Sequence, residues 1–290
     1  MTDLPAPRLP GFAAAFAEQV RVVGLAVRPQ AAGLALVLLA AGILRLLDVQ
    51  DSGGEASAFP IPPVLMIVLG ALSPFAVWKG EQVFGHAHLF TLPVEKRRHA
   101  LAKVLAGGLW LTLAVAAIQL ALIGLALATG GSVGESETRM MAGPGGVQDL
   151  VPVRWSTPAW QWATPFTTAL VCYVIGSAFM LGAKYPLRWG TAAVAAFLGV
   201  GLLGEFGIVG GLPQLLFEQA NMGPFGINQA IGVGVANEIE GAPPAPGSNA
   251  SMLVLWYSLP SLETWGRAVL AWAAAACIAL WIAASRHREG

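Results

Sequence analysis

The residue types that most often carry out chemistry are scarce in this sequence and lie outside its apolar runs. All four histidines, His86, His88, His99 and His287, fall in a polar segment, residues 79–103, or in the C-terminal tail. We therefore expect no haem held between helices. His86 and His88 are two residues apart with no cysteine nearby, so we predict no metal site there. The phosphate-binding pattern G-x-x-x-x-G-K-[ST] is absent, and we predict no catalytic residue and no cofactor in this chain.

The composition is that of a membrane protein. Hydrophobic residues make up 56% of the 290 residues and charged residues 11%, against about 25% charged in an average soluble domain. The mean hydropathy is +0.67, and the apolar residues cluster in runs near the roughly 20 residues that a helix needs to cross a bilayer. We predict an all-α membrane protein, a single transmembrane domain over residues 1–290, with six transmembrane helices at about 31–47, 64–78, 104–129, 163–183, 189–208 and 267–285.

Three further segments have their own patterns. In residues 11–28 apolar side chains recur every three or four positions, at Phe12, Phe16, Val20, Val23 and Val27. This predicts an amphipathic interfacial helix closed by Pro29, the alternative being an ordinary cytosolic helix. Residues 130–162 are predicted as a long polar loop. The Gly/Pro-rich stretch 209–264 contains two short apolar pieces, 212–220 and 251–259, which we interpret as re-entrant or interfacial helices between spans five and six. The two cysteines, Cys172 and Cys277, lie in apolar runs and are interpreted as small buried hydrophobic residues.

The distribution of charge predicts the orientation. Six spans place both termini on one side of the membrane. Twelve of the 16 lysines and arginines fall on that side, and the other four are Arg45, Arg139, Arg154 and Arg267. Because cytoplasmic loops carry the excess of Lys and Arg, both termini are expected in the cytoplasm, with the chain a multi-pass protein of the cell's inner or plasma membrane. The formal net charge is zero, and we expect no nucleic acid partner.

Two polar residues in the apolar runs are candidates for a translocation pathway. Gln119 lies near mid-depth of the predicted third span, where a hydrogen bond to a neighbouring helix is the favoured interpretation. Glu205 lies about 25 Å along its helix from Arg188, near the outer interface, where snorkelling or capping is favoured. Ion-coupled carriers place ionisable residues near the midplane, so the nearly charge-free span centres disfavour that class.

The segment 79–103, KGEQVFGHAHLFTLPVEKRRHALAK, mixes apolar and cationic side chains between the second and third predicted spans. It resembles the corresponding segment of the membrane subunits of ABC-2 type ABC transporters, which follow E-x-x-x-G-x-x-x-x-x-x-x-LPV-x-[RK]-R and are closed by a lysine. The matching residues are Glu81, Gly85, Leu92-Pro93-Val94, Arg97-Arg98 and Lys103. The sequence departs from the pattern at Gln82, where an arginine is common, and at His86-Ala87, where a small polar residue is expected.

The resemblance implies that this segment contains a coupling helix seated in a cleft of a separate ABC ATPase subunit. The residues expected to dock are Glu81, Phe84, Gly85, His88, Phe90, Leu92, Pro93, Arg97 and Arg98. Pro93 disfavours helix at Leu92, so a break there would separate a short helix, about 81–90, from the third span. The basic residues alone have another interpretation, as a topology determinant in contact with anionic lipid.

The resemblance further implies an exporter permease subunit whose partners are the ATPase, a second permease subunit in a homo- or heterodimer, and membrane lipid. ATP and Mg²⁺ are expected on the ATPase. Two other classes stay open: a polytopic membrane enzyme with its site in residues 130–162 or 209–264, and an ion-coupled carrier. The sequence does not indicate the substrate.

Overall fold

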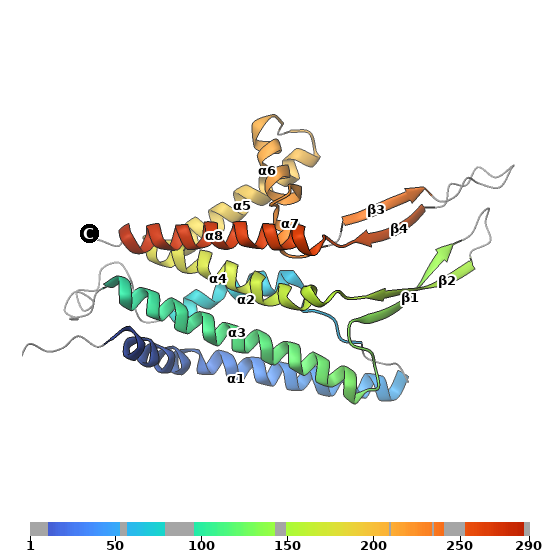
Figure 1. The fold of residues 1–290 in the computed structure, drawn as a ribbon, viewed down its shortest axis with the longest axis horizontal. Coiled ribbons are helices and arrows are strands. Elements are labelled where there is room, and N and C mark those ends of the chain that lie inside the picture. Colours follow the sequence, from blue (N-terminus) through green and yellow to red (C-terminus); the bar gives the residue numbers. More distant parts are fainter. Residues whose placement is uncertain are drawn as a thin grey trace, which may run out of the picture.

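The computed structural model of the chain describes residues 11–52, 57–78, 96–142, 149–208, 210–233, 235–240 and 253–286. Its elements are, in chain order, α1 (Phe12–Ser52), α2 (Pro63–Val77), α3 (Lys96–Ala128), β1 (Glu135–Ala142), β2 (Asp149–Ser156), the 3₁₀-helix η2 (Ala159–Ala163), α4 (Thr164–Gly182), α5 (Pro186–Glu205), α6 (Leu212–Met222), α7 (Ile227–Ala230), β3 (Val235–Glu240), β4 (Leu253–Ser258) and α8 (Leu262–Arg286). In Figure 1, α1, α2, α3, α4 and α8 run along the long axis as a bundle, and α5 with α6 stands off one side.

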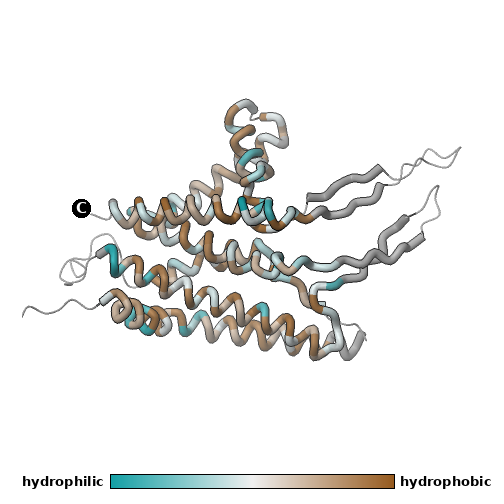
Figure 2. The backbone as a smooth tube through the Cα atoms, in the orientation of Figure 1, coloured by the Kyte–Doolittle hydropathy of each residue, from teal (hydrophilic) through white to brown (hydrophobic). Residues whose placement is uncertain are grey.

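The prediction of a helical chain with apolar helices of membrane-spanning length is confirmed. Five helical segments in the described part of the chain are long and apolar enough to cross a membrane: Phe12–Leu44, Arg97–Ala128, Ala159–Gly182, Pro186–Gly204 and Leu262–Ser285. Figure 2 shows hydrophobic residues along these helices. The sixth apolar helix, α2, has 15 residues, which is fewer than the roughly 20 that a span needs. The structure thus contains five helices of spanning length and a shorter one, where six spans were predicted.

α1 is one helix of 41 residues that continues through Pro29. The prediction that Pro29 ends a separate interfacial helix is therefore wrong on this point. A proline removes one backbone hydrogen bond and crowds the preceding turn, which bends a helix more often than it ends one that is packed on a neighbour. Figure 1 shows the dark-blue N-terminal turns of α1 running in a different direction from the rest. The whole helix is about 60 Å long, twice the roughly 30 Å of a hydrocarbon core.

The apolar stripe in the first half of α1 packs against the protein. Val23 is fully buried, and Phe16, Val20 and Val27 pack around the same core. Trp110 of α3 donates a hydrogen bond from Nε1 to the carbonyl of Val20 at 2.9 Å. Four residues of the predicted stripe therefore pack in the bundle, whereas the fifth, Phe12, is 44% exposed.

α2 and α4 lie in close contact because small residues face each other between them. At Gly70 an added Cβ would meet the carbonyl oxygen of Ala169 and would come 2.9 Å from the Cβ of Cys172. At Gly176 it would come 2.9 Å from Cγ of Pro74. In lipid, where the hydrophobic effect does not hold helices together, such close van der Waals contact is the main source of helix association.

α4 is joined to α3 by a buried tyrosine. Tyr173 is 1% exposed and donates a hydrogen bond from its hydroxyl to the carbonyl of Val104 at 2.9 Å. The absent side chain of Gly107 makes room for it, since an added Cβ would meet the Tyr173 hydroxyl. The polar end of the ring is therefore satisfied inside an apolar bundle, which is the usual requirement for a buried tyrosine.

Two antiparallel hairpins occupy the long connections, β1 with β2 and β3 with β4. Both extend from the end of the bundle at which α4 and α8 begin (Figure 1). The polar loop predicted at 130–162 is wrong, since most of it is β1, β2 and η2. The helix predicted at 251–259 is also wrong. Its residues LVLWYS form β4, and the valine and aromatic residues suit a strand once a partner strand is present. The helix predicted at 212–220 corresponds to α6.

The connections at the hairpin end are held together by backbone hydrogen bonds. Ala58 donates to Ser132 at 2.9 Å and accepts from Gly134 at 2.8 Å, and Gly134 in turn accepts from Thr157 at 2.7 Å. Gly134 has φ +73°, a left-handed conformation that a glycine adopts without strain. The segment before α2, which contains Ala58, is thus fixed to the base of the hairpin formed by β1 and β2.

Both cysteines are free. Cys172 of α4 is half-buried and Cys277 of α8 is exposed. The expectation that both are buried is wrong for Cys277, because one face of α8 is turned away from the bundle. A thiol is apolar enough to lie there against lipid.

Candidate functional site

The structure describes both flanks of the predicted docking segment. Residues 79–95 lie outside the described residues, and with them the predicted docking residues Glu81, Phe84, Gly85, His88, Phe90, Leu92 and Pro93. Arg97 and Arg98 lie in the first turn of α3. On the other side, Trp78 caps the C-terminus of α2. The segment therefore joins the end of α2 to the start of α3.

A buried cation connects these two flanks. Nζ of Lys103 lies 4.8 Å from the ring centroid of Trp78. Lys103 is 2% exposed and Trp78 4% exposed, so the contact is shielded from solvent. A cation over an indole face contributes about 2 kcal/mol or more when desolvated, and burying a charge without such compensation is costly. The pair fixes the end of α2 to the second turn of α3.

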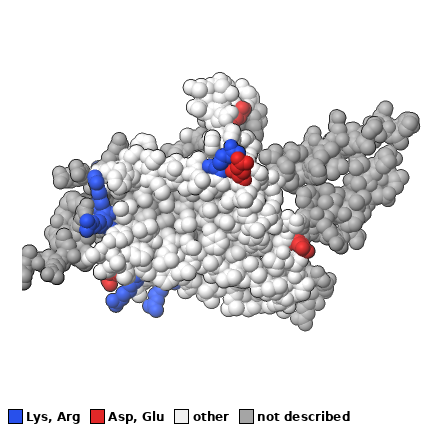
Figure 3. Space-filling model, in the orientation of Figure 1, with Lys and Arg blue, Asp and Glu red and all other residues white. Residues whose placement is uncertain are grey.

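Other cations at this end of the bundle also lie over aromatic rings. Cζ of Arg97 is 5.8 Å from the ring centroid of Trp281 on α8. In the connection from α4 to α5, two cations lie over the ring of Tyr185, with Nζ of Lys184 at 5.7 Å and Cζ of Arg188 at 5.0 Å from its centroid. Figure 3 shows lysine and arginine side chains near the end of the bundle opposite the hairpins. The described chain thus has a cationic, aromatic end.

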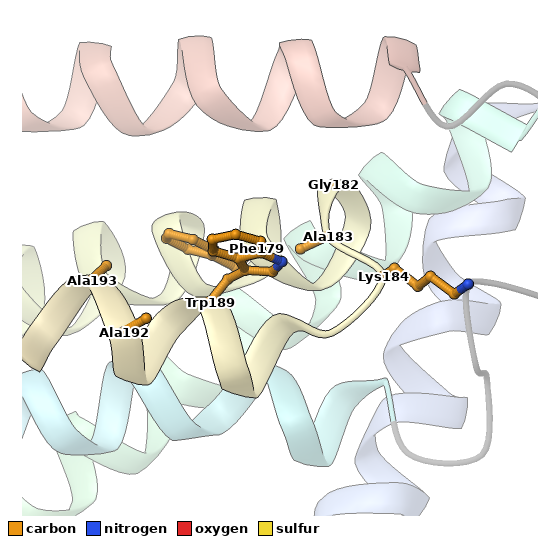
Figure 4. Close-up of a pocket in the computed structure, with 7 residues that line it drawn as sticks. All are labelled: Phe179, Gly182, Ala183, Lys184, Trp189, Ala192 and Ala193. Atoms are coloured by element: carbon orange, nitrogen blue, oxygen red, sulfur yellow. The ribbon is translucent and has the colours of Figure 1, made fainter.

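Next to the α4–α5 connection is a groove of about 600 Å³. Figure 4 shows its lining: Phe179, Gly182 and Ala183 from α4 and the residue after it, Lys184 from the connection, and Trp189, Ala192 and Ala193 from α5. The two aromatic rings lie over the helices, and the Lys184 side chain projects away from them beyond the turn. The groove is apolar along the helices and cationic at their end. From the sequence, Lys184 and Arg188 contributed only to the predicted orientation. The signal for this site was the aromatic residues interleaved with them in Lys184–Trp189, KYPLRW.

A second, smaller cavity of about 190 Å³ lies between α2, α4, α7 and α8. Its walls are almost wholly aliphatic, with Thr168 and Cys172 among the few side chains that carry a polar atom. Trp272 lines it and is oriented by a hydrogen bond from its Nε1 to the carbonyl of Phe225 at 2.9 Å. An apolar cavity of about 150 Å³ suffices for a ligand of benzene size, so this one suits a small hydrocarbon group.

The structure does not bring the two pathway candidates together. Gln119 is 5% exposed. Its Oε1 accepts a hydrogen bond from the backbone N–H of Ile61, and its Nε2 donates one to the carbonyl of Phe59, both at 3.3 Å. The partners are in the extended segment before α2, where a neighbouring helix was expected. Glu205 is the last residue of α5. A pathway role for either residue stays a prediction.

Replacing Gln119 by leucine should destabilise the protein. The substitution leaves the Ile61 N–H and the Phe59 carbonyl unpaired, and a buried unsatisfied polar group costs about 1–3 kcal/mol. We expect a lower midpoint of thermal unfolding in detergent. Gln119→Glu, measured at a pH low enough to protonate the carboxyl, is the matched control, since it keeps an acceptor for Ile61 and a donor for Phe59 and should lose less. A leucine variant that unfolds at the wild-type temperature but transports poorly would instead assign Gln119 to the pathway.

No protein-family model, no curated protein and no solved structure matches this chain.

Proposed function

We propose that this chain is the permease subunit of an ABC-2 type exporter and that it couples to a separate ABC ATPase through residues 79–103. The observation that carries the proposal is the sequence arrangement Glu81, Gly85, Leu92-Pro93-Val94, Arg97-Arg98 and Lys103 between two apolar helices. Support comes from the position of its flanks. Trp78 and Arg97 both lie at one end of the bundle, among other cations, as a cytoplasmic docking surface requires.

The contacts around the segment suggest how ATPase movement would reach the helices. A force on the coupling helix acts on α2 and α3 together, because Lys103 and Trp78 fix them to each other. α2 is in turn packed closely on α4 at Gly70. ATP and Mg²⁺ would be bound by the ATPase subunit, and two permease subunits, identical or related, would together line the pathway. The step driven by ATP would be a rocking of packed helices between inward- and outward-facing states.

In the proposed topology α2 is a sixth, short span. Its 15 residues extend about 22 Å, and a short apolar helix is accommodated by local thinning of the bilayer or by its neighbours. In Figure 1 the start of α1 and the end of α8 lie at the same end of the bundle, which six spans require. That end has the cations, so both termini would be cytoplasmic.

Cysteine labelling tests this topology. In a background with Cys172→Ala and Cys277→Ala, we expect Glu137→Cys, in β1, to react with an impermeant thiol reagent on intact cells. Arg98→Cys, at the start of α3, should react only after the cells are permeabilised. Reaction of Arg98→Cys alone on intact cells would mean that the orientation is reversed.

Co-expression with the cognate ABC ATPase tests the function. The wild-type chain should copurify with the ATPase and raise ATP hydrolysis in the complex. Phe90→Asp, or deletion of residues 85–90, should abolish the complex, because a charge in place of a buried aromatic anchor typically removes most of a docking energy. Val133→Asp, in an exposed position at the hairpin end, is the control and should assemble normally. Normal assembly of both segment variants would show that residues 79–103 do not dock the ATPase.

A further inference from the structure

We infer that the groove beside the α4–α5 connection binds an anionic phospholipid, with the phosphate at Lys184 and Arg188 and an acyl chain along Phe179 and Trp189. The inference depends on the helices being embedded in a membrane and is independent of the transport proposal. It concerns residues outside the 79–103 segment. Its ligand is a lipid of the leaflet at the cationic end of the bundle.

The charges at this turn have no anionic partner in the described chain. Lys184 and Arg188 are both exposed and lie over the same ring, that of Tyr185. The acidic residue Glu263 at the other end of the bundle is paired with Arg267, at 2.7 Å. Two like charges held near one ring repel each other, and an anion bound between them removes that repulsion. A phosphodiester is the anion that a membrane supplies at this depth.

An apolar surface along the helices lies next to the cationic turn. Figure 4 shows Lys184 reaching beyond the helix ends, while Phe179 and Trp189 lie back along the helices. The rest of the groove surface includes Gly182, Ala192 and Ala193, and these small residues leave the groove open. Trp189 is 63% exposed, as is common for a tryptophan at headgroup depth. A volume of about 600 Å³ is within the usual range for a small-molecule site.

A cationic turn next to an apolar groove favours a phospholipid over a soluble anion. A free phosphate would use the cationic turn alone and would gain nothing from Phe179 or Trp189. A zwitterionic lipid would use the apolar groove, but its own amine would offset the attraction of the two cations. The site therefore selects a lipid that has a net negative headgroup and an acyl chain.

Native mass spectrometry of the purified full-length protein tests the inference, with phosphatidylglycerol and phosphatidylcholine as the two probes. The wild type should retain phosphatidylglycerol in preference to phosphatidylcholine. Lys184→Gln combined with Arg188→Gln should weaken phosphatidylglycerol binding about 30-fold, since each cation near a membrane surface contributes about a factor of five. The single substitution Lys184→Arg keeps both positive charges, so this variant should retain most of the phosphatidylglycerol binding.

The matched control is Arg21→Gln combined with Arg28→Gln, which removes two cations of the same cationic end from α1. This variant should bind phosphatidylglycerol as the wild type does. Equal loss in both double variants would show a general charge effect and overturn the site. Equal retention of the two lipids by the wild type, or displacement of phosphatidylglycerol by millimolar glycerol phosphate, would overturn it as well. Each variant's elution on size exclusion establishes that it is folded.

Discussion

Replacing Gly70 by alanine should force α2 away from α4 and destabilise the whole bundle. The new methyl group would meet the carbonyl oxygen of Ala169, and backbone in a packed helix has no free space into which it can retreat. Overpacking of this kind costs about 1–3 kcal/mol, which exceeds the roughly 1 kcal/mol that alanine gains over glycine from helix propensity. We expect a lower midpoint of thermal unfolding in detergent and less monodisperse protein.

Gly124→Ala is the control for this prediction. Gly124 lies within α3, and nothing comes within 4 Å of the position where its Cβ would be. The same substitution should there be neutral or slightly stabilising, since helix propensity alone acts. If Gly70→Ala and Gly124→Ala unfold at the same temperature, the close approach of α2 and α4 is not a source of stability.

The helices could be predicted because each is a long apolar run with its own boundaries. α4 begins and ends within about two residues of the expected 163–183, since Pro165 at its start and the Pro186 beyond its end are local signals. α1 was divided incorrectly at Pro29 for a related reason. The sequence shows that a proline interrupts the helix, but only the packing of Val20 and Val23 on α3 decides that the helix continues.

The hairpins could not be predicted because strand formation there depends on a partner far along the chain. Leu253–Ser258 has a strand-like composition, yet it is short and apolar enough for a buried helix, and periodicity does not separate the two. The pairing with Val235–Glu240 decides the structure. The same holds for the candidate site. The motif in residues 79–103 is local, whereas the contact of Arg97 with Trp281 on α8 joins distant parts of the sequence.

A double-mutant cycle on Trp78 and Lys103 should show that their contact stabilises the flanks of the docking segment. Trp78→Leu removes the aromatic face and leaves an apolar side chain, while Lys103→Met removes the charge and keeps the length of the side chain. Because the pair is almost fully buried, we expect a coupling free energy of about 2 kcal/mol between the two substitutions, measured from unfolding in mixed micelles. Trp78→Phe should retain part of the stability, since a phenyl ring still offers a π face.

The same variants separate stability from coupling. If movement passes from residues 79–95 into α2 and α3 through this contact, Trp78→Leu should leave the ATPase bound but reduce the ATP hydrolysis that the permease stimulates. Trp78→Phe should retain more of that stimulation than Trp78→Leu does, because it also retains more of the stability. Additivity of the two substitutions to within about 0.5 kcal/mol would show that the ring and the cation do not interact. Full stimulation with Trp78→Leu would show that the contact stabilises the helices and carries no movement between the subunits.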